Sequence, residues 1–120
     1  MRTMMFATMA LVAGLITTQS SGSASADPCA GNFCNRTTVT KLFPIGNNDP
    51  RVHVRPTDGG LNALACTAVG QYLTLKASHP LFSEIYAALL DATIHNKDVT
   101  FRIVTGSPDC EISYIVLENP

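Results

Sequence analysis

The side chains with the clearest binding chemistry stand in a short polar run, Asn35-Arg36-Thr37. The amide of Asn35 and the guanidinium of Arg36 hold hydrogen-bond donors in fixed planes, and the hydroxyl of Thr37 both donates and accepts. Tyr72 adds an aromatic ring with a polar tip, on which a sugar ring could stack. We therefore predict that these four residues bind the hydroxyls and ring of a sugar. A strand face exposed to water is the alternative for the polar run.

Catalytic residues are not expected in this sequence. Its serines lack the G-x-S-x-G pattern of a nucleophile elbow. Asp91 and His95 stand four residues apart within a segment that favours a helix, and a surface contact between neighbouring turns accounts for that spacing. The histidines and cysteines have no spacing typical of zinc ligands. We expect a protein that is not an enzyme and that needs no metal and no cofactor.

The first 26 residues have the pattern of a secretory signal peptide. Arg2 is their only charge, an apolar run extends from Met4 to Ile16, and small residues precede Ala26. The apolar run is too short to cross roughly 30 Å of hydrocarbon as a helix. We therefore expect cleavage after Ala26 and a secreted or periplasmic domain over residues 27–120, without a membrane span.

Composition limits what this domain can be. The chain has 120 residues, of which 46% are hydrophobic and 14% are charged, and its formal net charge is −1. This length fits one domain, and scattered charges of both signs argue against a nucleic-acid partner. All four cysteines follow the predicted cleavage site, so two disulfides are expected in an exported domain. These cysteines are Cys29, Cys34, Cys66 and Cys110.

The elements that must position these side chains follow from residue periodicity and turn residues. β-Branched and alternating apolar residues predict strands, and an apolar 3-4 spacing after Pro80 predicts one helix. The final strand is apolar on both faces, which indicates burial on both sides or an edge covered by a partner. The predicted strands cover residues 35–43, 52–55, 64–75, 99–104 and 111–118, and Gly70 indicates a bulge or a sharp bend within the third. The predicted helix covers residues 78–96.

The order β-β-β-α-β-β predicts a mainly β protein with the five-stranded barrel of an OB-fold. A split sheet with one packed helix is the alternative. In an OB barrel the third and fifth strands run parallel, so Cys66 and Cys110 would stand at neighbouring strand starts. That arrangement favours the pair Cys66–Cys110 and leaves Cys29 with Cys34. The other two pairings that four cysteines permit stay open.

Several segments resemble the B subunits of subtilase-cytotoxin and typhoid-toxin type, within the pertussis-like AB5 toxins. The resemblance lies in the order and spacing of the segments and not in any single motif. The segments are Thr38-Val39-Thr40-Lys41-Leu42-Phe43, Ala65-Cys66-Thr67, Leu81-Phe82-Ser83-Glu84-Ile85-Tyr86 with Asn96-Lys97-Asp98 after it, and Val99-Thr100-Phe101-Arg102-Ile103.

The resemblance implies an OB-fold that forms a homopentamer, binds a cell-surface glycan and serves a catalytic A subunit. This chain departs from the family in having no tryptophan, and Cys34-Asn35-Arg36-Thr37 stands where the family has a sugar-binding serine. We therefore expect a secreted, non-enzymatic glycan-binding module. The alternative is a monomeric periplasmic or secreted domain that binds a protein or has a structural role, without a sugar site.

Overall fold

A computed structural model describes residues 14, 28–57 and 60–118 of the chain. The predicted signal peptide lies outside the described residues, apart from Gly14. None of the helices in the described ranges has the length and apolar character that a membrane crossing requires. The elements are β1 (Cys29–Ala30), β2 (Phe33–Thr37), β3 (Val39–Ile45), β4 (Arg51–Pro56), the 3-10 helix η1 (Leu61–Ala63), β5 (Leu73–Lys76), α1 (Phe82–Ile94), β6 (Val99–Ile103) and β7 (Ile112–Leu117).

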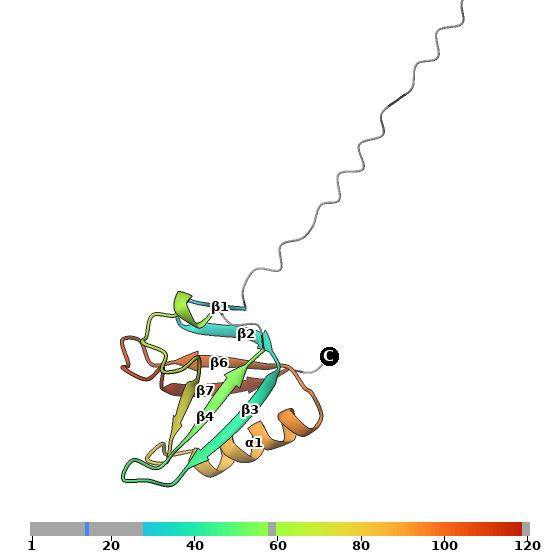
Figure 1. Cartoon of the computed structure of the whole chain (residues 1–120). Helices are drawn as coiled ribbons and strands as arrows, with labels where there is room; N and C mark the ends of the chain where they lie inside the picture. The colour runs from blue at the N-terminus through green and yellow to red at the C-terminus, as the bar shows by residue number, and fades with distance from the viewer. Residues whose placement is uncertain (1–13, 15–27, 58–59, 119–120) are drawn as a thin grey trace, which may run out of the picture.

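The strands form two antiparallel sheets, ordered β1-β2-β6-β7 and β3-β4-β5 (Figure 1). Thr38 alone separates β2 from β3, so one extended segment passes from the first sheet to the second. The pairing of β2 with β6 shifts between Cys34 and Thr37, and such a bulge bends a strand. The predicted strand over residues 35–43 is therefore divided between the two sheets.

The predicted third strand is much shorter than expected. Only Leu73–Lys76 forms a strand, and a 3-10 helix and turns occupy the chain before it. The reason is local, because Gly70 and Gln71 have positive φ angles that an extended strand cannot contain. The prediction of a strand from Leu64 to Leu75 was wrong, whereas the sharp bend indicated at Gly70 is present as a turn over Val69–Tyr72.

The two sheets come together where β5 meets the start of β7. Thr74 forms a parallel bridge with Glu111, and the backbone N–H of Thr74 donates to the Cys110 carbonyl oxygen at 3.0 Å. This bridge does not close a barrel within the described part of the chain. The structure confirms a mainly β protein with one helix, while the closed five-stranded OB barrel stays a prediction.

Both disulfides have the predicted pairing. Cys29 bonds to Cys34 between the adjacent strands β1 and β2, and Cys66 bonds to Cys110 across 44 residues of sequence. In the chain-entropy account, closing a loop of that length stabilises the fold by roughly 4 kcal/mol. The Cys66–Cys110 bond therefore ties the segment before β5 to the start of β7.

The single helix was correctly predicted from its periodicity. The face that carries Ile85, Leu89 and Ala92 is buried against the strands. The backbone N–H of Leu81 donates to His79 Nδ1 at 2.9 Å before the helix, and Asn96 takes a positive φ after it. The largest fully buried side chains are Phe101, Leu73, Leu75, Leu89, Ile103 and Ile112.

The last strand is buried on one part of its length only. Ile112 is fully buried, whereas Tyr114, Val116 and Leu117 are 43–47% exposed. The register of β6 on β7 shifts between Arg102 and Ile103, so the faces of β7 exchange near its start. Burial on both sides is therefore not what the described residues show.

Candidate functional site

The polar run Asn35-Arg36-Thr37 does not present three side chains to a ligand. Asn35 and Arg36 are exposed, but Thr37 is only 4% exposed. The Thr37 hydroxyl donates to the carbonyl oxygens of Thr57 at 3.1 Å and of Thr38 at 3.3 Å. Thr37 therefore stabilises the junction between β2 and the end of β4, and its predicted contact with a sugar does not fit this position.

The backbone at Arg36 explains why the run is split between faces. Arg36 has a φ of 46°, an uncommon value for a residue with a side chain. Its backbone N–H donates to Thr100 Oγ1 at 3.1 Å instead of continuing the regular ladder. This bulge between Cys34 and Thr37 breaks the alternation of side chains that a simple strand would have.

Tyr72 lies in an aromatic patch on the outer face of the β3-β4-β5 sheet. Its ring stacks on the His53 imidazole, with 5.3 Å between ring centres and 19° between planes. The Phe43 ring meets it edge-on at 5.7 Å. Phe43 and His53 are cross-strand partners in β3 and β4, so the sheet register fixes two of the three rings. We call Phe43, His53 and Tyr72 the aromatic patch.

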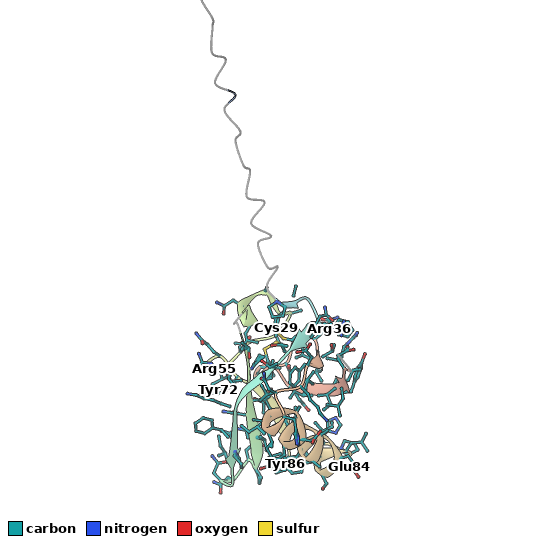
Figure 2. The ribbon with its side chains drawn as sticks, turned by 90° about the vertical axis from the view of Figure 1, so that its right-hand side faces the viewer. Cys29, Arg36, Arg55, Tyr72, Glu84 and Tyr86 are labelled. Carbon is teal, nitrogen blue, oxygen red and sulfur yellow. A yellow bond between two sulfur atoms is a disulfide. The ribbon has the colours of Figure 1, made fainter. Side chains whose placement is uncertain are left out.

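The predicted binding residues are not brought together. Figure 2 shows Tyr72 beside Arg55 on one side of the domain and Arg36 on the other. Tyr72 therefore belongs to a different surface from Asn35, Arg36 and Thr37. The predicted set of four residues is not one site in this structure.

A tight turn over Val69–Tyr72 places the tyrosine. The backbone N–H of Tyr72 donates to the Val69 carbonyl oxygen at 3.2 Å, and both central residues, Gly70 and Gln71, have positive φ angles. A Cβ atom at Gly70 would make ordinary van der Waals contact with the Tyr72 ring at 3.4 Å, so the positive φ is what favours glycine here. Gln71, a residue that disfavours this conformation, accepts a hydrogen bond from Arg55 Nη2 at its Oε1, 3.1 Å away.

Cations border the aromatic patch. Lys41 and Arg55 are direct cross-strand partners in β3 and β4, two residue pairs along from Phe43 and His53 and therefore on the same face. Like charges in that relation destabilise a sheet, and they attract anions and other hydrogen-bond acceptors. Arg51, two residues from His53 on β4, already contacts Asn47 and Asp49 in the preceding loop.

The surroundings of His53 favour its neutral form. Arg51 Nε donates to His53 Nε2 at 3.1 Å, which requires that this nitrogen carry no proton. Partial burial and, to a lesser extent, the charge of Arg51 lower the pKa of His53 below 6.5, while Asp109 acts in the opposite direction. The patch therefore contains a neutral imidazole between two arginine positions of β4.

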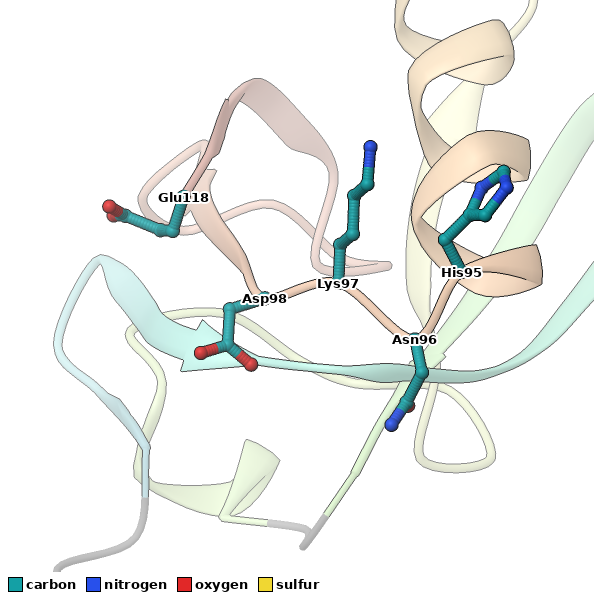
Figure 3. A pocket seen from close by; sticks show the side chains of 5 residues that line it. All are labelled: His95, Asn96, Lys97, Asp98 and Glu118. Atoms are coloured by element: carbon teal, nitrogen blue, oxygen red, sulfur yellow. The ribbon is translucent and has the colours of Figure 1, made fainter. Parts of the chain in front are cut away.

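A second candidate site is a surface hollow of about 350 Å³ at the end of α1. Figure 3 shows that its side chains point in different directions and do not converge on one point. Lys97 is bound to Asp91 at 2.9 Å, and Glu118 accepts a hydrogen bond from the Thr100 hydroxyl at 2.9 Å. The hollow offers no set of convergent groups to a ligand. Its lining residues are His95, Asn96, Lys97, Asp98 and Glu118.

The predicted surface contact between Asp91 and His95 is present. Asp91 Oδ1 lies 2.9 Å from His95 Nδ1, and both side chains are largely exposed. The hydrogen bond from Lys97 is the main cause that lowers the pKa of the Asp91 carboxyl, and the charges of Lys97 and His95 add to it. Asp91 is thus paired with both Lys97 and His95 on the surface of the protein.

Comparison with known proteins adds no relative. No protein-family model, curated protein or solved structure matches this chain. The resemblance to AB5 toxin B subunits therefore stays a prediction from the sequence. In the described ranges, no group of three or more His, Cys, Asp or Glu side chains is placed to hold a metal ion.

Sequence reasoning found Tyr72 but missed the residues around it. Phe43 and His53 become neighbours of Tyr72 only through the register of β3 on β4, which local periodicity does not determine. The signal that could have located Arg55 and Gln71 is the Gly70-Gln71 turn directly before Tyr72. The tight turn places Tyr72, the residue directly before β5, against His53 in the middle of β4.

Proposed function

We propose that this protein is a secreted or periplasmic, non-enzymatic binding module for a cell-surface glycan, and that the aromatic patch is its binding site. The observation that carries the proposal is the Tyr72 ring, stacked on His53 and bordered by planar hydrogen-bonding groups of Arg55 and Gln71. Aromatic side chains pack against the apolar face of a sugar ring, and polar neighbours form hydrogen bonds with its hydroxyls.

The chemistry of recognition follows from this arrangement. The C–H face of a pyranose ring would lie against Phe43, which is 47% exposed, and against the Tyr72 edge. The Arg55 guanidinium and the Gln71 amide would donate to ring hydroxyls, and Lys41 would contact an acidic substituent where the glycan carries one. Because Arg55 and Gln71 already contact each other, little side-chain freedom is lost when a sugar binds.

The proposed OB-fold supports the position of the site. Joined as one bent strand, β2 and β3 would be the first OB strand, and β4, β5, β6 and β7 would be the other four. The parallel bridge between Thr74 and Glu111 is the contact expected between the third and fifth strands. OB barrels bind oligosaccharides on the face of their second and third strands. His53 lies on β4 and Tyr72 directly precedes β5, which corresponds to that face.

A shallow single site binds sugars weakly, and assembly compensates for this. A homopentamer would present five copies of the aromatic patch to one membrane surface and raise the effective affinity by multivalency. The homopentamer and a catalytic A subunit are parts of the proposal that depend on the resemblance to AB5 toxins. Sedimentation of the purified protein tests the first part, since a monomer at all concentrations would contradict the ring.

A glycan array of neutral and acidic oligosaccharides tests the site. We expect the wild-type protein to bind at least one class and Tyr72→Ala to weaken that binding by at least tenfold. Tyr114→Ala is the matched control, because Tyr114 is an exposed tyrosine of the other sheet, and it should leave binding unchanged. Binding to no glycan would contradict the function, and equal losses in both variants would contradict the site.

One observation favours the alternative, a monomeric domain that binds a protein. β7 is an edge of its sheet and exposes Tyr114, Val116 and Leu117. Such edges can accept a strand from another chain. A charge on this edge, Val116→Lys, should abolish capture of a protein partner in that case and leave glycan binding intact.

A further inference from the structure

Two buried polar atoms without hydrogen-bond partners lie near His53. They are the Thr74 hydroxyl oxygen and Asp109 Oδ1. Thr74 is 1% exposed and is the direct cross-strand partner of His53 between β4 and β5. Asp109 acts electrostatically on His53 and raises the pKa of the imidazole. Asp109 is therefore a carboxylate that acts on His53 and whose Oδ1 has no hydrogen-bond partner among the described residues.

The contact with Arg51 is possible only while His53 is neutral. Arg51 Nε donates to His53 Nε2, so a proton on Nε2 would replace the acceptor with a second donor. The two groups would then also carry like charges at a separation of 3.1 Å. Protonation thus removes a hydrogen bond and adds a repulsion at the same place.

The Tyr72 ring depends on the imidazole for its position. The two rings are stacked nearly parallel, whereas Phe43 touches Tyr72 only edge-on. A turn of the imidazole away from Arg51 therefore removes the surface on which Tyr72 rests. The Val69–Tyr72 turn keeps the backbone in place, so the change falls on the side chain.

We propose that His53 is a proton-sensitive residue that controls the position of Tyr72, so that acidification releases a ligand from the aromatic patch. In acid, the imidazolium leaves Arg51, turns toward Asp109, and breaks its stack with Tyr72. This inference rests on the proposed glycan-binding function for its ligand, although the coupling of His53 to Tyr72 is a property of the protein alone.

The surrounding charges determine where the change occurs. Arg51 and partial burial lower the pKa of His53 below 6.5, and Asp109 opposes them. Lys76 Nζ lies 3.5 Å from Asp109 and 3.8 Å from Glu111, so Asp109 acts on His53 while it is also paired with Lys76. The change therefore falls on the acid side of pH 6.5. The charged and titratable groups that face the patch are Lys41, Arg51, Arg55, Tyr72, Lys76, Asp109 and Glu111.

Linkage sets the size of the effect on binding. A ligand that binds only while one histidine is neutral loses affinity by at most about tenfold for each pH unit below the pKa of that histidine. Above the pKa the affinity is constant. The expected profile is therefore flat at neutral pH and falls with a slope of no more than one decade per unit in acid.

NMR titration of the protein over residues 27–120, without ligand, tests the coupling directly. The His53 ring signals and the Tyr72 ring signals should shift with one common midpoint below pH 6.5, and the Arg51 Nε–H signal should broaden at the same midpoint. The Tyr114 ring should not follow it. Tyr72 signals that stay constant through the His53 titration would overturn the proposal.

Two variants move the midpoint in opposite directions. Arg51→Met removes the cation and the donor that favour neutral His53, so the common midpoint should rise. Asp109→Asn removes the opposing carboxylate, so the midpoint should fall. His95→Gln is the matched control, because His95 is an exposed histidine at the end of α1, and it should leave the midpoint unchanged. Movement in the same direction for both variants would overturn the assignment.

Binding at two pH values separates this inference from the proposed function. The strongest glycan from the array is measured at pH 7.5 and pH 5.0 with the wild type and with His53→Gln. We expect weaker binding at pH 5.0 for the wild type and a smaller change for the variant. Binding that is equal at both pH values would contradict the inference and leave the glycan site intact. Coupled ring signals without any glycan binding would contradict the function and leave the coupling intact.

Discussion

The outer faces of the two sheets contain similar residues that are engaged in different ways. On the four-stranded sheet, Phe33, Arg102 and Tyr114 are register partners across β2, β6 and β7. The Arg102 guanidinium there lies 4.6 Å from the centre of the Phe33 ring. On the three-stranded sheet, the aromatic rings contact one another, and Lys41 and Arg55 stand side by side.

This difference shows that composition alone does not define a binding surface. A cation over a ring is already stabilised by that ring, so Arg102 has part of its interaction inside the protein. The Lys41 side chain has no ion pair or hydrogen bond within the described ranges, and its cross-strand partner has the same charge. We infer that the three-stranded face has more side-chain groups available to contact a ligand than the four-stranded face does.

The largest effect is expected from the disulfides that support the two faces. Replacing Cys66 and Cys110 by serine should lower the free energy of unfolding by roughly 4 kcal/mol, whereas replacing Cys29 and Cys34 should cost about 2 kcal/mol because the closed loop is short. Urea unfolding of both double variants measures the difference. Equal losses would show that the two sheets do not depend on the long-range bond in this way.

The next effect concerns the predicted residue that turned out to be structural. Thr37→Val should destabilise the protein by about 1–3 kcal/mol, because the carbonyl oxygen of Thr57 loses its donor in a buried place. Asn35→Ala, two residues earlier and exposed, should change stability by less than about 0.5 kcal/mol. Thermal unfolding compares them. A Thr37→Val variant as stable as the wild type would contradict the structural role of this hydroxyl.

Substitutions at Gln71 should have smaller effects, and replacement by glycine should favour stability while it weakens binding. Gln71→Gly should be more stable than Gln71→Ala by about 1 kcal/mol, because glycine accepts the positive φ without strain. Both variants lose the contact with Arg55, so both should bind glycan more weakly than the wild type. Unfolding curves and array binding are measured on the same samples. A wild type at least as stable as Gln71→Gly would argue against strain in this turn.

The smallest effect compares one cation from each sheet. Lys41→Gln should stabilise the protein by about 0.2–0.5 kcal/mol, because it removes the repulsion with Arg55. Arg102→Gln should destabilise it by about 0.5–1 kcal/mol, because it removes the contact with the Phe33 ring. Chemical denaturation at low salt measures the change in the free energy of unfolding for both variants. Changes of the same sign would remove the distinction between the two faces.

The parts of the fold that the sequence predicted are those with a local cause. Pro80, the apolar spacing and Asn96 all lie within the helix or next to it, and the helix formed where they placed it. The pairing of Cys66 with Cys110 was also predicted correctly, although Cys66 lies in the segment before β5 and not at the start of a strand. These predictions required the order of the elements and no exact register.

The site could be predicted only in part, because its geometry depends on register. Tyr72 was identified as an aromatic platform, but its partners on β3 and β4 follow from a strand pairing that the sequence pattern does not give. Thr37 was misplaced for the same reason. A positive φ at Arg36 interrupts the alternation of the strand, and a shift of one residue exchanges the exposed and buried faces.

The most direct test of the central claim is backbone NMR mapping with the strongest glycan from the array at pH 7.5. We predict shift changes in residues 41–45, 51–55 and 70–73, which form the β3-β4-β5 face and the Tyr72 turn. Shift changes in residues 33–37 and 100–102 instead would place the ligand on the four-stranded sheet and contradict the account.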